Sequence, residues 1–180
     1  MPVPHPLTEE IQQVLRQLDV CPRLATHLSL VHDAALEIVI GLAQHFPDLQ
    51  IDQHAVCFGA GTHDLGKVLH LNELTGPGNQ HENDGPGLLE QHGIPPHLAR
   101  FARTHGAWDR EALEIEDLLV GLADTIWKGQ RIGPLEDLIV SRIAEATGKA
   151  KWEVFDTLDK IVTVIADKGD ERLEYQRQHE

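Results

Sequence analysis

The chain has 180 residues, which is close to one domain at a prior of about 150 residues each and is enough to bury a core without disulfides. Its 15 Lys and Arg against 29 Asp and Glu give a net charge of −14, so its field repels nucleic-acid polymers and anionic lipid surfaces. Two cysteines, and an opening segment without the basic and apolar parts of a signal peptide, predict a reduced, cytoplasmic protein. No apolar run approaches the roughly 18 residues of a membrane span. Twelve histidines, against one tyrosine and four phenylalanines, direct the search towards metal ligands.

Apolar residues recur at helical spacing along nearly the whole chain, without an alternating strand or hairpin turn. Helices are expected, in chain order, within segments 8–18, 22–47, 52–60, 95–105, 118–129, 135–148 and 152–165. Segment 72–87 has four glycines, two prolines and three asparagines and is expected to be a long loop. The charged tail 167–180 is expected to be a solvated or frayed helix end without function. The sequence therefore predicts one all-α domain over 1–180, a bundle of about seven or eight helices with C-terminal helices in 134–180.

Residues 61–67, Gly-Thr-His-Asp-Leu-Gly-Lys, have the spacing of a phosphate-binding P-loop. The next residue is Val68, which has no hydroxyl group for magnesium, and a helical pattern rather than a buried strand precedes the motif. We therefore reject a P-loop.

Six histidine and aspartate residues occupy positions from which a helical bundle could direct ligands inward to a divalent metal. They are His27, His63, Asp64, His81, His105 and Asp124. His27 borders the apolar stripe of its predicted helix, and His63 and Asp64 are adjacent at the end of another. Asp124 lies on an apolar helix, where a buried carboxylate would cost several kcal/mol unless it is paired or bound to a metal.

The same residues stand in an ordered series of short strings. These are Arg23-Leu-Ala-Thr-His27, His63-Asp64-Leu65-Gly66-Lys67, His81-Glu82-Asn83-Asp84-Gly85, Phe101-Ala-Arg-Thr-His105 and Leu122-Ala123-Asp124. With this series the chain resembles the HD domain superfamily of metal-dependent phosphohydrolases over its core motif region, residues 23–131. The resemblance implies a helical bundle with His27, His63, Asp64 and Asp124 around one metal ion. In the family's six-ligand subset, His81 and His105 would hold a second ion.

Six ligands exceed what one ion needs when water or substrate must also bind, so two ions that share Asp64 as a bridge are the economical arrangement. Nitrogen and oxygen ligands without thiolate suit iron or manganese, and zinc, cobalt or nickel could substitute. Asp64 and Lys67 are the expected catalytic residues. Arg23 and Lys67, each one helical turn from a histidine of the series, are expected to bind the phosphate of the substrate. Lys128 and Arg131, which follow Asp124 by four and seven residues, are second choices for the same role.

The predicted function is hydrolysis of a small phosphorylated metabolite, with a nucleotide as the favoured substrate, because an acidic protein with a small basic cluster prefers compact anions. Two alternatives stay open: an HD-type diiron oxygenase, and a non-catalytic sensor that binds a metal and a nucleotide. The cyclic-dinucleotide phosphodiesterase branch is disfavoured, because it has paired histidines where this chain has Thr104-His105, and a Gly-Tyr-Pro string that is missing here. No nucleic-acid polymer or membrane partner is expected, and pairing of two subunits is left open.

Other polar and aromatic residues receive supporting roles. Glu82 is expected to orient its neighbour His81 from outside the ligand set. The three tryptophans, Trp108, Trp127 and Trp152, are expected in the core or in a pocket wall. The remaining histidines are expected to have surface or structural roles; among them are His32, His45, His54, His70, His92 and His97.

Overall fold

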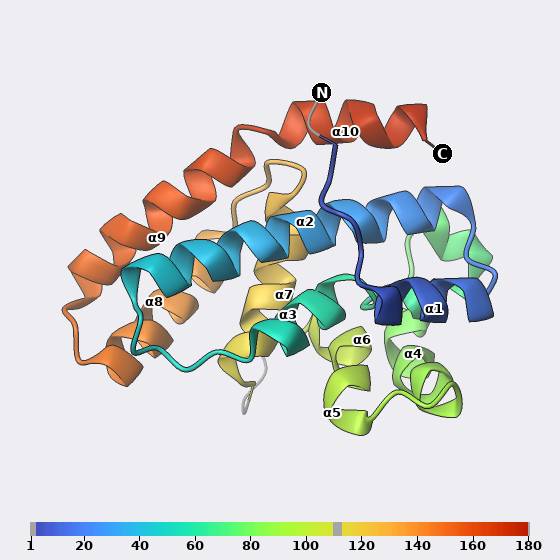
Figure 1. Ribbon diagram of the computed structural model, residues 1–180, viewed down its shortest axis with the longest axis horizontal. Helices are drawn as coiled ribbons and strands as arrows, with labels where there is room; N and C mark the ends of the chain where they lie inside the picture. Colours follow the sequence, from blue (N-terminus) through green and yellow to red (C-terminus); the bar gives the residue numbers. More distant parts are fainter. Residues whose placement is uncertain (1–2, 110–112, 180) are drawn as a thin grey trace.

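The computed structural model describes residues 3–109 and 113–179, and in these residues it contains helices and connecting segments without a strand (Figure 1). Eight of the described α-helices have eight or more residues, which confirms the predicted all-α bundle of seven or eight helices. They are α1 Glu9–Gln17, α2 Pro22–His45, α3 Gln53–Ala60, α4 Gln80–Gln91, α7 Ile115–Ile126, α8 Gly133–Thr147, α9 Lys151–Ala166 and α10 Gly169–Gln178. Shorter turns are α5 Pro96–Ala99, α6 Phe101–Thr104 and the 3-10 helices η1 Leu65–Val68 and η2 Leu71–Leu74.

Helix α2 is the central element of the bundle and packs against α3, α7 and α9 (Figure 1). Leu28, Val31, Ala35 and Ile38 lie on its buried face with no exposed surface, at the four- and three-residue spacing of one helical stripe. By length and composition alone, α2 is apolar enough to cross a membrane, which corrects the expectation that no segment qualifies. However, 56% of the relevant window is buried inside the fold, as in the core helix of a bundle.

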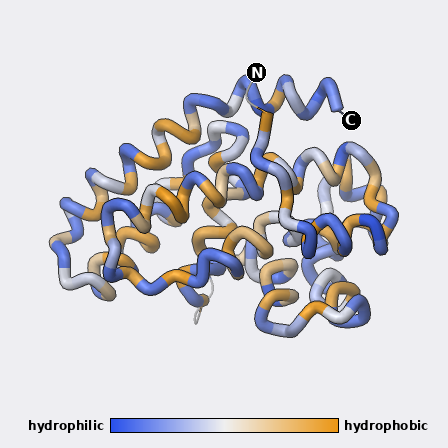
Figure 2. Tube along the Cα trace, viewed as in Figure 1, coloured by the Kyte–Doolittle hydropathy of each residue, from blue (hydrophilic) through white to orange (hydrophobic). Residues whose placement is uncertain are grey.

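The other helices form two groups beside α2. Helices α8 and α9 pack on each other at one end of the molecule, and α9 continues along α2 (Figure 1). Helix α4 packs against η1 and α6 at the other end, while α7 lies between these groups and contacts both α2 and α3. Hydrophobic positions recur along each of the packed helices and alternate with hydrophilic ones (Figure 2). The ends of α3, α6 and α7 and the start of α4 thereby converge near the first turns of α2.

The segment expected as a long loop, 72–87, is instead half helical, since α4 begins at Gln80 and continues through Pro86. Its glycines serve close packing. A Cβ atom on Gly85 would lie 2.8 Å from the Cβ atom of Ala102 in α6. A Cβ atom on Gly66 in η1 would lie 2.2 Å from the carbonyl oxygen of His81 in α4. The glycines therefore allow α4 to approach its neighbours, and this close approach places His81.

The charged tail is also more ordered than expected, because most of it forms α10; Glu180 lies outside the described residues. Arg172 in α10 is only 2% exposed. Its Nη2 atom lies 3.1 Å from the Oδ2 atom of Asp33 and 2.6 Å from the Oε1 atom of Glu37, both in α2. The tail is therefore attached to the central helix by a buried ion pair, which its overall composition does not reveal.

Candidate metal centre

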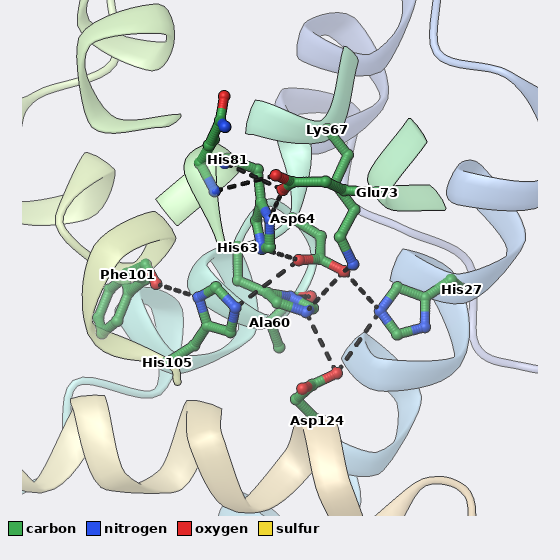
Figure 3. Close-up of polar contacts among 11 residues, drawn as sticks. His27, Ala60, His63, Asp64, Lys67, Glu73, His81, Phe101, His105 and Asp124 are labelled. Atoms are coloured by element: carbon green, nitrogen blue, oxygen red, sulfur yellow. Dashed lines mark hydrogen bonds and ion pairs between the residues drawn. The ribbon is translucent and has the colours of Figure 1, made fainter. Parts of the chain in front are cut away.

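All six residues of the predicted series come together in one cluster (Figure 3). His27 comes from the first turns of α2, and Asp124 comes from the last turns of α7. His63 and Asp64 lie in the turn between α3 and η1, His81 lies in the first turn of α4, and His105 follows α6. The cluster therefore joins residues that are as many as 97 positions apart, from His27 to Asp124.

The carboxylate of Asp64 lies at the middle of the cluster (Figure 3). Its Oδ2 atom is 3.2 Å from Nε2 of His27 and 3.7 Å from Nε2 of His63. Its Oδ1 atom is 3.1 Å from Nε2 of His81 and 3.6 Å from Nε2 of His105. Each oxygen of one carboxylate thus faces a different pair of imidazoles, which is the arrangement expected of a bridging ligand.

Asp124 completes the group that faces Oδ2 of Asp64. Its Oδ1 atom lies 3.3 Å from Nε2 of His63 and 3.5 Å from Nε2 of His27. The ligand atoms of His27, His63 and Asp124 all lie within 4.8 Å of one another. These three residues could therefore hold one metal ion.

The group that faces Oδ1 of Asp64 contains one residue more than expected. Atoms of His81, Glu82 and His105 also lie within 4.8 Å of one another. Glu82 thus lies beside the two imidazoles as a further candidate ligand, whereas it was expected to orient His81 from outside the ligand set. These residues could hold a metal ion of their own.

The outer nitrogens of three imidazoles are fixed by hydrogen bonds. The Nδ1 atom of His63 lies 2.9 Å from the carbonyl oxygen of Ala60, and that of His105 lies 3.0 Å from the carbonyl oxygen of Phe101. Because a carbonyl oxygen can only accept, each Nδ1 atom donates, and the lone pair of Nε2 points into the cluster. This tautomer is the one that coordinates a metal through Nε2.

His81 is oriented by Glu73, a residue that was not predicted from the sequence. The Oε2 atom of Glu73 lies 2.6 Å from Nδ1 of His81. The same carboxylate accepts the backbone N–H groups of Gln80 at 3.0 Å and His81 at 3.2 Å. Burial opposes ionisation of Glu73, but the hydrogen bonds from His81 and Gln80 lower the pKa of this carboxyl. The only sequence signal is an acidic residue inside a segment otherwise rich in glycine and proline.

The inner nitrogens of the imidazoles indicate that the cluster fits a metal. The Nε2 atoms of His27, His63 and His81 are buried and have no hydrogen-bond partner among the described residues, although carboxylate oxygens lie close to them. Buried polar atoms in folded proteins are almost always paired. Three such atoms directed towards the buried carboxylate of Asp64 and the half-buried carboxylate of Asp124 have the donor set and the arrangement of metal ligands. The buried histidine and aspartate groups could therefore hold a metal ion.

The charges of the cluster reinforce one another. Burial opposes ionisation of Asp64, but the surrounding imidazoles of His63, His27 and His81 hold the pKa of its carboxyl well below the usual range. Burial also opposes ionisation of Asp124, and His63 lowers the pKa of that carboxyl to about 2. Both carboxylates are therefore ionised at neutral pH and able to bind a cation.

These carboxylate charges and burial shift the pKa values of two histidines in opposite directions. Burial lowers the pKa of His63, but Asp64 and Asp124 outweigh burial and raise it. In His105 burial dominates and, with the charge of His63, lowers the pKa to about 4. His105 is therefore neutral at pH 7, whereas at His63 a proton competes with a cation.

The predicted phosphate-binding residues divide into two pairs. Lys67 and Arg23 line the pocket beside the cluster, and Nζ of Lys67 lies 2.5 Å from Oδ2 of Asp64. Lys128 is exposed and does not line this pocket. Arg131 pairs instead with Glu136 in α8 at 2.5 Å and with a carboxylate of α9. Lys128 and Arg131 lie away from the cluster because α7 ends at Ile126, so the spacing from Asp124 does not continue on the same helical face.

The three tryptophans, which were expected in the core or in a pocket wall, differ in their exposure to solvent. Trp127 is 4% exposed, lines the pocket and packs edge-on against His27 with ring centroids 5.2 Å apart, as expected of a pocket wall. Trp108 packs against the hydrophobic core. Trp152 is 72% exposed at the start of α9, so its expected burial is wrong.

The chain was also compared with known proteins. No protein-family model, no curated protein and no solved structure matches it. Its chemistry must therefore be inferred from the arrangement of its own residues.

Proposed function

We propose that the protein is a metal-dependent phosphohydrolase of the HD type, which cleaves the phosphate ester of a small phosphorylated metabolite with two divalent ions. The observation that supports this proposal best is the position of Asp64, whose two oxygens lie 3.2 Å from His27 and 3.1 Å from His81. A carboxylate placed between two groups of imidazoles is suited to bridge two ions. The nitrogen and oxygen donors without thiolate favour iron or manganese over softer ions, with zinc, cobalt and nickel as substitutes.

The candidate ligands divide between the two ions. His27, His63 and Asp124 would hold one ion, His81, Glu82 and His105 would hold the other, and Asp64 would contact both. Bound ions would polarise the phosphoryl oxygens and supply hydroxide at neutral pH, because coordination lowers the pKa of water towards about 7.

The chain's own cations would act on the phosphate group. Arg23 and Lys67 line the pocket beside the candidate ligands. A guanidinium group can bind phosphate through two parallel hydrogen bonds, whereas an ammonium group acts as a point charge. Lys67 is held beside Asp64 by an ion pair, so its charge stays next to the candidate metal ligands. In this proposal, Arg23 orients the substrate and Lys67 stabilises the charge that develops in the transition state.

The proposal is tested by turnover in the absence of oxygen. Protein purified without chelators and loaded with iron or manganese is incubated under nitrogen with a panel of phosphate monoesters and diesters. We expect hydrolysis, measured as phosphate released from a monoester or monoester formed from a diester, that requires the metal and is abolished by Asp64→Asn. The exposed Asp84→Asn variant is the matched control and should keep the activity. A fully loaded protein that hydrolyses no ester of the panel would refute the proposal.

A diiron oxygenase is the second candidate, because nitrogen and oxygen donors around one bridging carboxylate also suit a pair of iron ions. Oxygen consumption by the iron-loaded protein, without phosphate release, would favour it. A sensor would instead bind a nucleotide stoichiometrically and release nothing. The same panel, measured with and without oxygen, therefore separates the three functions.

A further inference from the structure

The cluster opens into a pocket of about 240 Å³ whose wall includes a helix that contributes no candidate ligand. The polar side of the pocket contains His27, Asp64 and Lys67. Leu173 and Gln176 of α10 line it as well. Helix α10 thus borders the space that a substrate would occupy, while every candidate metal ligand comes from another part of the chain.

Helix α10 is fixed at both of its ends. At its start, Gly169 packs closely on the connection between α7 and α8. A Cβ atom added to Gly169 would lie 2.6 Å from the backbone nitrogen of Gly129 in that connection. One turn later, the buried Arg172 is paired with two carboxylates of α2. At the far end, the hydroxyl of Thr26 in α2 donates to the carbonyl oxygen of His179 at 3.1 Å. Helix α10 is therefore held over the first turns of α2, where His27 is located (Figure 1).

The anchored side of α10 is also the side that borders the pocket. Leu173 and Gln176 are three residues apart and follow the buried Arg172 by one and four positions, so the three side chains share one part of the helix surface. Leu173 and Gln176 are half-buried. Their position beside the pocket is thus set by the same ion pair that fixes the helix.

The size and chemistry of this wall restrict the organic part of a substrate. Pockets that enclose drug-sized ligands have volumes of roughly 300–1,000 Å³, and this pocket is smaller although it must also hold the phosphate group. Leu173 offers an apolar surface, and the amide of Gln176 offers a donor and an acceptor that match a hydroxyl group. The enclosed space suits a short hydroxylated group, whereas a nucleoside would have to extend beyond Leu173 and Gln176 into solvent.

We propose that α10 is a size-selective wall, through Leu173 and Gln176, which admits phosphate monoesters of compact, hydroxylated organic groups and excludes nucleotides. This inference rests on the proposed phosphohydrolase function, and it narrows the substrate class from the nucleotide that the sequence favoured. Leu173 limits the length of the organic group, and Gln176 binds its hydroxyl group.

The test is the selectivity of the full-length, metal-loaded protein. The value of kcat/KM is measured for glycerol 3-phosphate, ribose 5-phosphate and adenosine 5′-monophosphate. We expect the wild type to prefer the first two esters. Leu173→Ala should raise the preference for the nucleotide, relative to glycerol 3-phosphate, by roughly 10-fold or more, which is the effect of a methylene-sized change in a pocket. Glu171→Ala, an exposed change in the same helix, should leave the selectivity unchanged.

A second variant tests the polar contact without opening the pocket. Gln176→Leu should raise KM for ribose 5-phosphate while kcat changes little, because the lost hydrogen bond is made equally in the ground and transition states. Preference of the wild type for the nucleotide, or equal selectivity in the wild type and Leu173→Ala, would overturn the inference.

Binding of the same three esters, measured by calorimetric titration, separates the two proposals. If the wild type hydrolyses none of the esters but binds the compact ones better, the proposed function fails and the size-selective wall stands. If the wild type binds the nucleotide as well as the compact esters, the wall fails whatever the turnover. A wild type that binds none of the esters refutes the wall as well.

Discussion

Glu73→Gln should weaken one metal site and spare the other. The carboxylate of Glu73 accepts from Nδ1 of His81 at 2.6 Å and from two backbone N–H groups at 3.0 and 3.2 Å. Glutamine keeps one acceptor oxygen but replaces the other with an NH2 group, which cannot accept from the imidazole. The change therefore removes the negative charge beside His81 and leaves one of the three N–H groups without an acceptor, which weakens the hold on the tautomer and orientation of His81. Loss of such a partner lowers metal affinity by roughly 10- to 100-fold.

The assay is a competition titration that resolves two binding steps, with manganese and a chromophoric chelator. We expect the weaker affinity in only one step, because His27, His63 and Asp124 do not contact Glu73. Asp84→Asn is the matched control: it also removes a carboxylate that pairs with a histidine at 2.7 Å, but that pair lies outside the cluster. Equal weakening of both steps, or the same effect in the control, would refute the role of Glu73.

Three further predictions concern metal content, stability and pH. His81→Ala and His27→Ala should each remove about one equivalent of bound metal, counted by mass spectrometry of the purified protein, and loss of both ions in each variant would contradict two separate sites. Arg172→Met should lower the free energy of unfolding in urea by about 2 kcal/mol, since Asp33 and Glu37 lose a buried cation and keep, among the described residues, only His5 and Lys168 as partners. Lys160→Met, in an exposed pair, should change it little, and equal effects would be contrary evidence. Burial lowers the pKa of His32 below 6.5, so the folded protein favours the neutral imidazole. The contribution of His32 to the free energy of unfolding should therefore be complete above pH 6.5 and be lost as the pH falls. An NMR titration of His32 with a midpoint at or above 6.5 would contradict this prediction.

The fold class and the clustering of the six candidate ligands could be predicted because both follow from the spacing of residues along the chain. Apolar spacing identified the helices, and polar residues such as His27 and Asp124 stood out against apolar stripes. Glu73 could not be predicted in the same way, because its role depends on the fold, which brings its carboxylate next to Nδ1 of His81. The position of Arg131 could not be predicted from its spacing to Asp124, because that position is set by ion pairs with Glu136 of α8 and Asp159 of α9.

Composition misled in two segments for related reasons. Glycine is typical of loops, but it also allows helices to approach closely, and only the packed structure shows that Gly66 and Gly85 have the second role. Likewise, a mainly charged tail is usually solvated, and its composition does not show that Arg172 is buried. In both cases, the decisive partner lies in another helix.

The attachment of α10 has a practical consequence for any truncation of this protein. A chain cut after Lys168 would retain all six candidate ligands, so its metal content could remain normal. It would nevertheless lose Arg172, leave Asp33 and Glu37 without that cation, and lack one side of the substrate pocket. Metal analysis of a shortened chain would therefore be a poor guide to the specificity of the complete protein.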